Sequence, residues 1–257
     1  MKQLPNLFTL LNLFFGCIAI VFLLQTDTIF IYTSDEFTSS FNIPEKIAAG
    51  SLFLFAAAAV DFLDGFVARM FKCGSEMGKQ LDSLADVVSF GAAPGIIIYQ
   101  LLRMSYLRED NGMEVAFAWL LPAFIVPCAA AYRLAKFNLD QSQRYGFKGV
   151  PTPAAGLLIA SLPLILHYGT GGVHVGAILI NKWFLYTLTA VISWLMMSNL
   201  PLMAMKFKDY TLKNNLYKLV LLGIGLVAAF FLQWLAVPVV FVAYILLSLT
   251  LKNNTAL

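Results

Sequence analysis

The sequence predicts an all-α fold, a polytopic membrane helical bundle of about eight transmembrane helices. Of its 257 residues, 60% are hydrophobic and only 12% are charged, whereas a soluble domain usually has about 25% charged residues. The apolar runs are close to the roughly 20 residues that a helix needs to cross a bilayer. Short alternating segments, which would indicate a membrane β-barrel, do not dominate the pattern.

The apolar runs can be assigned in order along the chain. The first lacks a basic cluster and a small-residue cleavage site, so we expect a retained helix rather than a signal peptide. The last two form one continuous stretch, where Gln233 and Trp234 indicate an interfacial break and Pro238 favours a new helix start. The predicted helices span residues 5–25, 46–71, 79–104, 114–138, 150–167, 178–198, 216–232 and 235–251.

The distribution of charge predicts the orientation. With the N-terminus in the cytoplasm, 13 of the 17 Lys and Arg residues fall on the cytoplasmic side, as the positive-inside rule requires for an even number of spans. A net charge of +3 gives no indication of nucleic-acid binding. The three cysteines form no CxxC pair and are interpreted as packing residues. We expect a single integral membrane domain over residues 1–257.

Four aspartates interrupt the second and third apolar runs. Asp61 and Asp64 are three residues apart and Asp82 and Asp86 are four apart, so each pair shares one helix face. The intervening "KCGSEMG" suits a tight turn, which makes the two helices an antiparallel hairpin. At 1.5 Å per residue, both pairs lie roughly 6–15 Å from the cytoplasmic helix ends. The two acidic faces are therefore expected to meet at similar depth.

Facing carboxylates repel one another, and a divalent cation removes that repulsion. All-oxygen ligands without nearby His or Cys favour Mg²⁺ or Mn²⁺ over Zn²⁺. Two ions sharing carboxylates could also clamp a phosphate, and Arg69 offers a cation for one. The competing interpretation is a set of polar helix contacts or a proton pathway. Gly91 and Gly95 form a GxxxG pattern that favours internal helix packing.

The order Asp61-x-x-Asp64-Gly65-x-x-Ala68-Arg69, eight residues, Gly78-x-x-x-Asp82-x-x-x-Asp86 resembles the signature of the CDP-alcohol phosphatidyltransferase family. The segments "LPNLFTLLNLFFGCIAI", "SLADVVSFGAAPG", "YRLAKFN" and "FKGVPTPAAG" are similar to those of its bacterial and archaeal phosphatidylserine synthases. One departure is Lys136, where arginine is more common. The resemblance implies a six-helix core plus two C-terminal helices, a homodimer, and a prokaryotic cytoplasmic membrane with the active site facing the cytoplasm.

The resemblance also implies roles for individual residues. Asp61, Asp64 and Asp82 would hold a first Mg²⁺ or Mn²⁺ ion, and Asp61, Asp82 and Asp86 a second. Asp86 is the candidate general base, a role that suits a carboxylate at the edge of a metal site. Asn6 and Thr9 could complete the nucleotide pocket, or only cap and bridge helices. The residues expected to bind CDP are Gly65, Ala68, Arg69, Gly78, Asn6 and Thr9.

The implied reaction transfers the phosphatidyl group of CDP-diacylglycerol to L-serine, giving phosphatidylserine and CMP. A serine carboxylate requires a cation, and Arg133 can bind one bidentately, although it could be an ordinary positive-inside anchor. Ser89 could assist, or only form a helix hydrogen bond. The expected acceptor-binding residues are Arg133, Asn138, Lys148 and Ser89.

Two other interpretations stay open at this point. Another alcohol, such as glycerol 3-phosphate, inositol phosphate or choline, could replace serine in the same chemistry. A phosphorylated acceptor would need several convergent cations. An ion or proton-coupled transporter could instead use the aspartates as a path, which would require carboxylates spread through the depth of the membrane.

Overall fold

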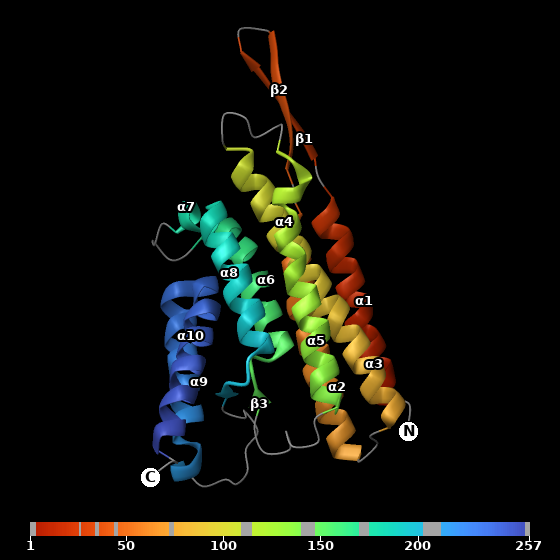
Figure 1. The fold of residues 1–257 in the computed structure, drawn as a ribbon, viewed down its shortest axis with the longest axis vertical. Coiled ribbons are helices and arrows are strands. Elements are labelled where there is room, and N and C mark those ends of the chain that lie inside the picture. Colours follow the sequence, from red (N-terminus) through yellow and green to blue (C-terminus); the bar gives the residue numbers. More distant parts are fainter. Residues whose placement is uncertain are drawn as a thin grey trace.

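A computed structural model describes residues 4–25, 27–33, 36–43, 46–71, 75–108, 115–139, 147–169, 175–202 and 212–254 of the protein. Long helices lie side by side in a bundle (Figure 1). The α-helices are α1 (Leu4–Leu24), α2 (Ile47–Phe71), α3 (Glu76–Asp86), α4 (Ala93–Tyr106), α5 (Ile125–Leu139), α6 (Thr152–Tyr168), α7 (Gly176–Leu179), α8 (Lys182–Met197), α9 (Leu212–Leu232) and α10 (Ala236–Asn254). The other elements are the π-helix η1 (Val87–Ala92), the 3₁₀ turns η3 (Phe117–Trp119), η4 (Leu121–Phe124) and η6 (Gln233–Leu235), and the strands β1 (Asp27–Thr33), β2 (Glu36–Ile43), β3 (Phe147–Lys148) and β4 (Pro201–Leu202).

The helical pattern agrees with a protein that crosses a membrane several times. Five described segments are long and apolar enough to span a bilayer, and α6 and α8 are shorter apolar helices. The last of the five contains α9 and α10, which run antiparallel on either side of η6 (Figure 1). The break at Gln233 and Trp234 is therefore confirmed, with Pro238 in the first turn of α10. Within the described ranges, each predicted helix has a helical counterpart and the polytopic helical fold is confirmed. The helix predicted over 114–138 is an α-helix only from Ile125, after the 3₁₀ turns η3 and η4.

The connection between α1 and α2 differs from the prediction, which assigned it no regular structure. Strands β1 and β2 pair antiparallel from Asp27 opposite Ile43 to Thr33 opposite Glu36. Their sequences, "DTIFIYT" and "EFTSSFNI", contain the β-branched and aromatic residues that favour strands. This hairpin extends from the end of the bundle opposite the start of α1 (Figure 1), so it lies away from the acidic segment described below.

The second and third long helices form the acidic hairpin, and the third is longer than predicted. Helix α3 begins at Glu76 because the Ser75 side chain caps it, accepting a hydrogen bond from the Gly78 backbone N–H at 2.9 Å. The helix then continues through the π-helix η1 into α4, ending at Tyr106. The π-helix starts directly after Asp86, so the local backbone changes where the acidic motif ends. Such single-turn π segments often occur at functional sites.

Close contacts at η1 bring neighbouring helices together. A Cβ added to Gly91 would lie 3.1 Å from Ala130 of α5, and one added to Gly156 of α6 would lie 2.9 Å from Phe90. Gly95 similarly faces Pro127, so the GxxxG pattern serves internal packing, as predicted. The buried apolar core extends from this region through α1, α2, α4, α5, α6 and α8 to Tyr244 of α10.

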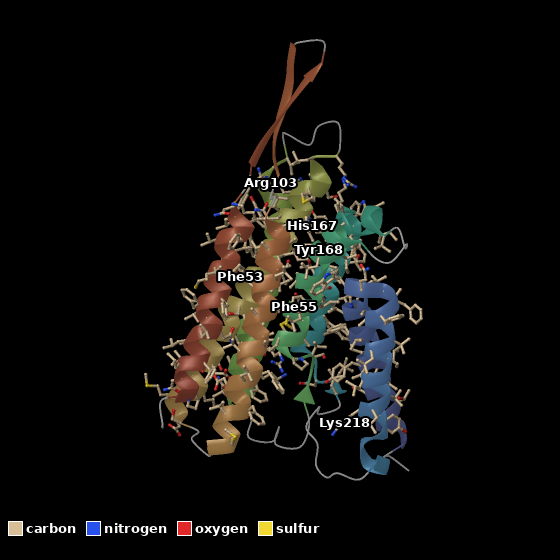
Figure 2. All side chains as sticks on the ribbon, turned by 180° about the vertical axis from the view of Figure 1, so that it is seen from behind. Phe53, Phe55, Arg103, His167, Tyr168 and Lys218 are labelled. Carbon is tan, nitrogen blue, oxygen red and sulfur yellow. The ribbon has the colours of Figure 1, made fainter. Side chains whose placement is uncertain are left out.

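The orientation predicted from charge places Arg103 and Lys218 on opposite sides of the membrane. Arg103 lies at the end from which the β-hairpin extends, near His167, and Lys218 lies at the other end (Figure 2). The acidic residues lie toward the end that carries Lys218, because α2 and α3 meet there (Figure 1).

Candidate active site

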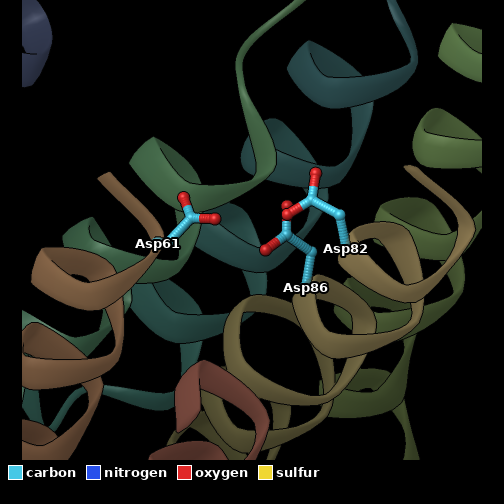
Figure 3. A group of neighbouring side chains, drawn as sticks. All are labelled: Asp61, Asp82 and Asp86. Atoms are coloured by element: carbon cyan, nitrogen blue, oxygen red, sulfur yellow. The ribbon is translucent and has the colours of Figure 1, made fainter. Parts of the chain in front are cut away.

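Three of the four aspartates converge between α2 and α3. A carboxylate oxygen from each of Asp61, Asp82 and Asp86 lies within 4.8 Å of the others. Asp61 points from α2 toward the two side chains on α3 (Figure 3). Asp86 is buried, and Asp61 and Asp82 are half-buried. The spacings of three and four residues thus place these carboxylates on facing sides of the hairpin, as the sequence predicts.

Asp64 lies beside this group and has a different partner. Its carboxylate accepts a hydrogen bond from the Thr9 hydroxyl of α1, and both side chains are buried. The same hydroxyl lies 3.2 Å from the Pro5 carbonyl oxygen. A charge-assisted hydrogen bond is the stronger of the two alternatives for a single hydroxyl proton. Thr9 therefore holds Asp64 at the edge of the acidic group.

A cavity of about 550 Å³ adjoins the carboxylates. All four aspartates line it, together with residues of α1, α3, α5 and the start of α6. Its volume lies in the range of small-molecule sites, about 300–1,000 Å³. Most of the side chains expected to form the site therefore meet in one place. The other lining residues are Pro5, Asn6, Thr9, Phe62, Gly65, Ser75, Gly78, Lys79, Ser83, Arg133, Leu134, Phe137, Asn138, Pro151 and Pro153.

Several of the residues expected to bind the nucleotide are among those that line the cavity. Asn6, Thr9, Gly65 and Gly78 line it. A Cβ on Gly78 would lie 2.9 Å from the Asn6 side-chain oxygen, so a glycine is needed for this close approach. The backbone of α2 includes the positions of Ala68 and Arg69, but their side chains lie outside the described part of the structure.

Two residues expected to bind the acceptor also line the cavity. Arg133 is 7% exposed, donates from Nη1 to the Thr152 hydroxyl at 2.9 Å, and stacks on Phe137 with 5.9 Å between the guanidinium carbon and the ring centre. The Asn138 amide donates to the Ser83 hydroxyl at 2.8 Å. Arg133 is also close enough to Asp86 for an electrostatic interaction. One positive and one neutral polar group thus adjoin the acidic cluster.

The other two expected acceptor residues do not contribute in the same way. Ser89 is fully buried, is not among the lining residues, and donates its hydroxyl to the Asn12 carbonyl at 3.2 Å. It lies in the π-helix η1, where it contacts α1. This position favours the other interpretation given above, in which Ser89 only forms a helix hydrogen bond. Lys148 lies on β3, and its side chain is outside the described part.

Sequence reasoning missed several polar residues around the cavity. Asn12 donates its amide to Asp86 at 3.3 Å, and it follows Thr9 by three residues, the same spacing by which Thr9 follows Asn6. That repeat was the signal that could have identified it. Lys79 lines the cavity and donates to the Asn138 carbonyl at 3.3 Å, although the sequence indicated only a topology signal. Ser83 and Thr152 carried no distinguishing pattern.

Comparison with known proteins gives the family of this chain. A family model described as CDP-alcohol phosphatidyltransferase matches residues 2–205. The chain belongs to the CDP-alcohol phosphatidyltransferase family. The match covers the acidic hairpin and ends before α9, so the last two helices lie beyond it.

The relatives described here all have the same name. A CDP-diacylglycerol–serine O-phosphatidyltransferase of Helicobacter pylori is 31% identical over 228 residues, covering 87% of this chain and 80% of the relative. That of Bacillus subtilis is 35% identical over 132 residues, covering 49% and 70%. That of Saccharomyces cerevisiae is 33% identical over 136 residues, covering 49% and 45%.

The described residues fit the metal on which CDP-alcohol phosphatidyltransferases depend. Three carboxylates supply hard oxygen donors at short mutual distances, which suits Mg²⁺ or Mn²⁺ better than a soft metal. Without a cation, their convergence would place like charges together in a partly buried site. The chemistry of the acidic group therefore suits a cation, independent of the family match.

Proposed function

We propose that the protein transfers the phosphatidyl group of CDP-diacylglycerol to L-serine and releases CMP. The convergence of Asp61, Asp82 and Asp86 at a cavity near one end of the bundle is the observation that carries this proposal. The names of the relatives support serine as the acceptor. The product, phosphatidylserine, remains in the membrane, while serine and CMP enter or leave from water.

The four aspartates would hold the divalent cations, Mg²⁺ or Mn²⁺, with Asp61, Asp82 and Asp86 as the central ligands and Asp64 at the edge. When bound, such ions neutralise the negative charge of a diphosphate and of the leaving nucleotide. Asn6 and the backbone at Gly78 would hold the cytidine end, since both line the cavity and lie close to each other. Arg69 is proposed as a further phosphate contact.

Serine would bind in the same cavity, next to Arg133. Its carboxylate would pair with the guanidinium of Arg133, whose orientation is held by Thr152 and Phe137. Asp86 would take the proton of the serine hydroxyl. The serine oxygen forms a bond to the phosphatidyl phosphorus, and the bond from that phosphorus to the bridging oxygen of the diphosphate breaks. CMP leaves with that electron pair.

The charge around the cavity favours serine over a phosphorylated alcohol. Among the cations whose side chains the structure describes, Arg133 and Lys79 line the cavity. Lys136 instead donates to the Asn199 side chain at 2.7 Å. A phosphorylated acceptor would need more convergent cations than this. A single buried guanidinium suits one carboxylate.

The distribution of acidic residues argues against a transporter. Within the five candidate spans, the Asp and Glu residues are the four aspartates and Glu76 at the start of the third span. An ion path would need polar groups through the depth of the bilayer. Here the carboxylates form a cluster toward one end, which suits a site that meets a lipid headgroup.

The decisive test is an acceptor panel. Purified protein would receive CDP-diacylglycerol, Mn²⁺ or Mg²⁺, and labelled L-serine, glycerol 3-phosphate, inositol phosphate or choline. We expect labelled phosphatidylserine and an equal amount of CMP. Release of CMP without incorporation of serine would reject L-serine as the acceptor. Asp82→Asn should abolish activity, whereas Glu76→Gln on the same helix, at a residue outside the cavity lining, should retain it.

We also propose that the acidic end faces the cytoplasm and that two copies associate. The positive-inside distribution of Lys and Arg supports the orientation, and the family resemblance supports the dimer. A reporter that is active only in the cytoplasm should be active when it is fused to the C-terminus. Light scattering of the purified protein should give the mass of two chains, and a monomer mass would contradict the second expectation.

A further inference from the structure

Asn12 stands out among the buried polar residues because it touches the acidic cluster from outside the cavity. It lies on α1, is 0% exposed, and does not line the cavity. Its amide Nδ2 donates to Oδ1 of Asp86, which is 6% exposed, at 3.3 Å. A buried amide in an apolar helix is costly unless its hydrogen bonds are satisfied, so this contact needs an explanation.

The position of Asn12 relative to Asp86 is fixed by a second contact. The Ser89 hydroxyl donates to the backbone carbonyl of Asn12 at 3.2 Å. One turn along α1, Gly16 faces the same serine, and a Cβ there would lie 3.1 Å from the Ser89 Cα and collide with its hydroxyl oxygen. Helix α1 therefore fits against η1 in a defined register. The π-helix begins immediately after Asp86, so this register also determines where Asp86 lies.

The hydrogen bond determines how the Asp86 carboxylate is presented. One carboxylate oxygen receives the amide of Asn12, and the Asp86 carboxylate also lies within 4.8 Å of Asp61 and Asp82. We propose that Asn12 is a positioning residue, which holds the Asp86 carboxylate in the orientation that keeps it within the acidic group. This inference rests on the proposed function, because it assigns Asn12 to the same site.

The chemistry of the side chain supports a specific role for an amide. Oδ1 of Asn12 is buried and has no hydrogen-bond partner among the described residues. A leucine of similar size would avoid that unsatisfied group, but it could not donate to Asp86. Exchange of the amide oxygen and nitrogen would bring two acceptors together. Among the described residues, the hydrogen bond from Nδ2 to Asp86 is therefore the one polar contact that the Asn12 side chain makes.

The chain offers a matched control in Gln100 of α4. Its buried amide donates to the Leu23 carbonyl at 2.8 Å, and its Oε1 also lacks a partner among the described residues. Gln100 therefore resembles Asn12 in burial and in joining α1 to the third span, but its partner is in the last turn of α1, at the other end from the acidic group. Asn12→Leu and Gln100→Leu each remove one buried interhelical amide.

The test combines kinetics with direct binding of Mn²⁺, followed by electron paramagnetic resonance. We expect Asn12→Leu to weaken Mn²⁺ binding and to lower kcat by about 10- to 100-fold, as for other residues that orient a metal ligand. The KM for serine should change less than kcat. Gln100→Leu should leave Mn²⁺ affinity and kcat near those of the original protein. Equal losses in the two variants, or no loss in Asn12→Leu, would overturn the inference.

A second variant covers the case in which leucine prevents folding. Asn12→Ala removes the amide without adding apolar bulk, and its melting temperature and elution volume would be compared with those of Gln100→Leu. It should show the same loss of Mn²⁺ affinity. The binding measurement also separates this inference from the proposed function. If the unaltered protein makes no phosphatidylserine but Asn12→Ala still weakens its Mn²⁺ binding, the acceptor assignment fails and the positioning role stands.

Discussion

Replacement of Arg133 by lysine tests how the acceptor is bound. The guanidinium is buried and is oriented by the Thr152 hydroxyl at 2.9 Å and by the ring of Phe137. Lysine keeps the positive charge but cannot form the two parallel hydrogen bonds that a guanidinium offers a carboxylate. A hydrogen bond to a charged group contributes about 1.5–3 kcal/mol, and about 1.4 kcal/mol corresponds to a tenfold change in affinity. Arg133→Lys should therefore raise the KM for serine by about 10- to 100-fold.

The assay measures initial rates against serine concentration at saturating CDP-diacylglycerol and Mn²⁺. The KM for CDP-diacylglycerol, measured in the same way, should change little because the nucleotide contacts proposed above are Asn6 and the backbone at Gly78 and do not include Arg133. Lys136→Gln is the matched control, since Lys136 follows on the same helix but donates to Asn199 and is not among the cavity-lining residues. The reasoning fails if the KM for serine is unchanged in Arg133→Lys or if Lys136→Gln raises it equally.

Three further results are expected. Thr9→Val should lower the free energy of unfolding by about 1–3 kcal/mol, measured by thermal melting, because the buried carboxylate of Asp64 loses its donor; an unchanged melting temperature would contradict this. Gly78→Ala should raise the KM for CDP-diacylglycerol by about tenfold, because the new Cβ would displace the Asn6 side chain, whereas Gly223→Ala, which meets nothing within 4 Å, should have no effect. Chelation with EDTA should abolish CMP release and added Mn²⁺ should restore it; activity that survives chelation would reject the metal assignment.

The helical bundle was predictable because hydrophobic length is a strong signal. The long apolar runs located the main helices, but not the short α7 or the division of the third span into α3, η1 and α4. Gln233 with Trp234 indicated the break between α9 and α10. The β1–β2 hairpin was missed, since its mixed polar and apolar residues lie between two much stronger helical patterns. The start of α3 was placed three residues late because the cap formed by Ser75 was not considered.

The sequence predicted which helix faces carry the aspartates, but not the side chain that each aspartate contacts. Spacings of three and four residues place the aspartates on facing sides of two helices whatever surrounds them. That rule treats the four as equivalent, yet Asp64 bonds to Thr9 and the other three converge. The distinction depends on α1, which is far from the acidic hairpin in sequence. Thr9 and Asp64 are 55 residues apart, and the spacing of the aspartates within their own hairpin cannot indicate which of them meets Thr9.

Ser89 shows why the details of this site depend on tertiary structure. On a continuous α-helix, a residue three positions after Asp86 would share its face, which is why the sequence suggested a role at the acceptor. In the structure, Ser89 lies in the π-helix that starts at Val87 and is not among the cavity-lining residues. Its hydroxyl then contacts the backbone of Asn12, whose amide contacts Asp86. Ser89 thus adjoins the acidic cluster only through α1, so a substitution there should act on Asp86 through the position of α1 rather than on the acceptor directly.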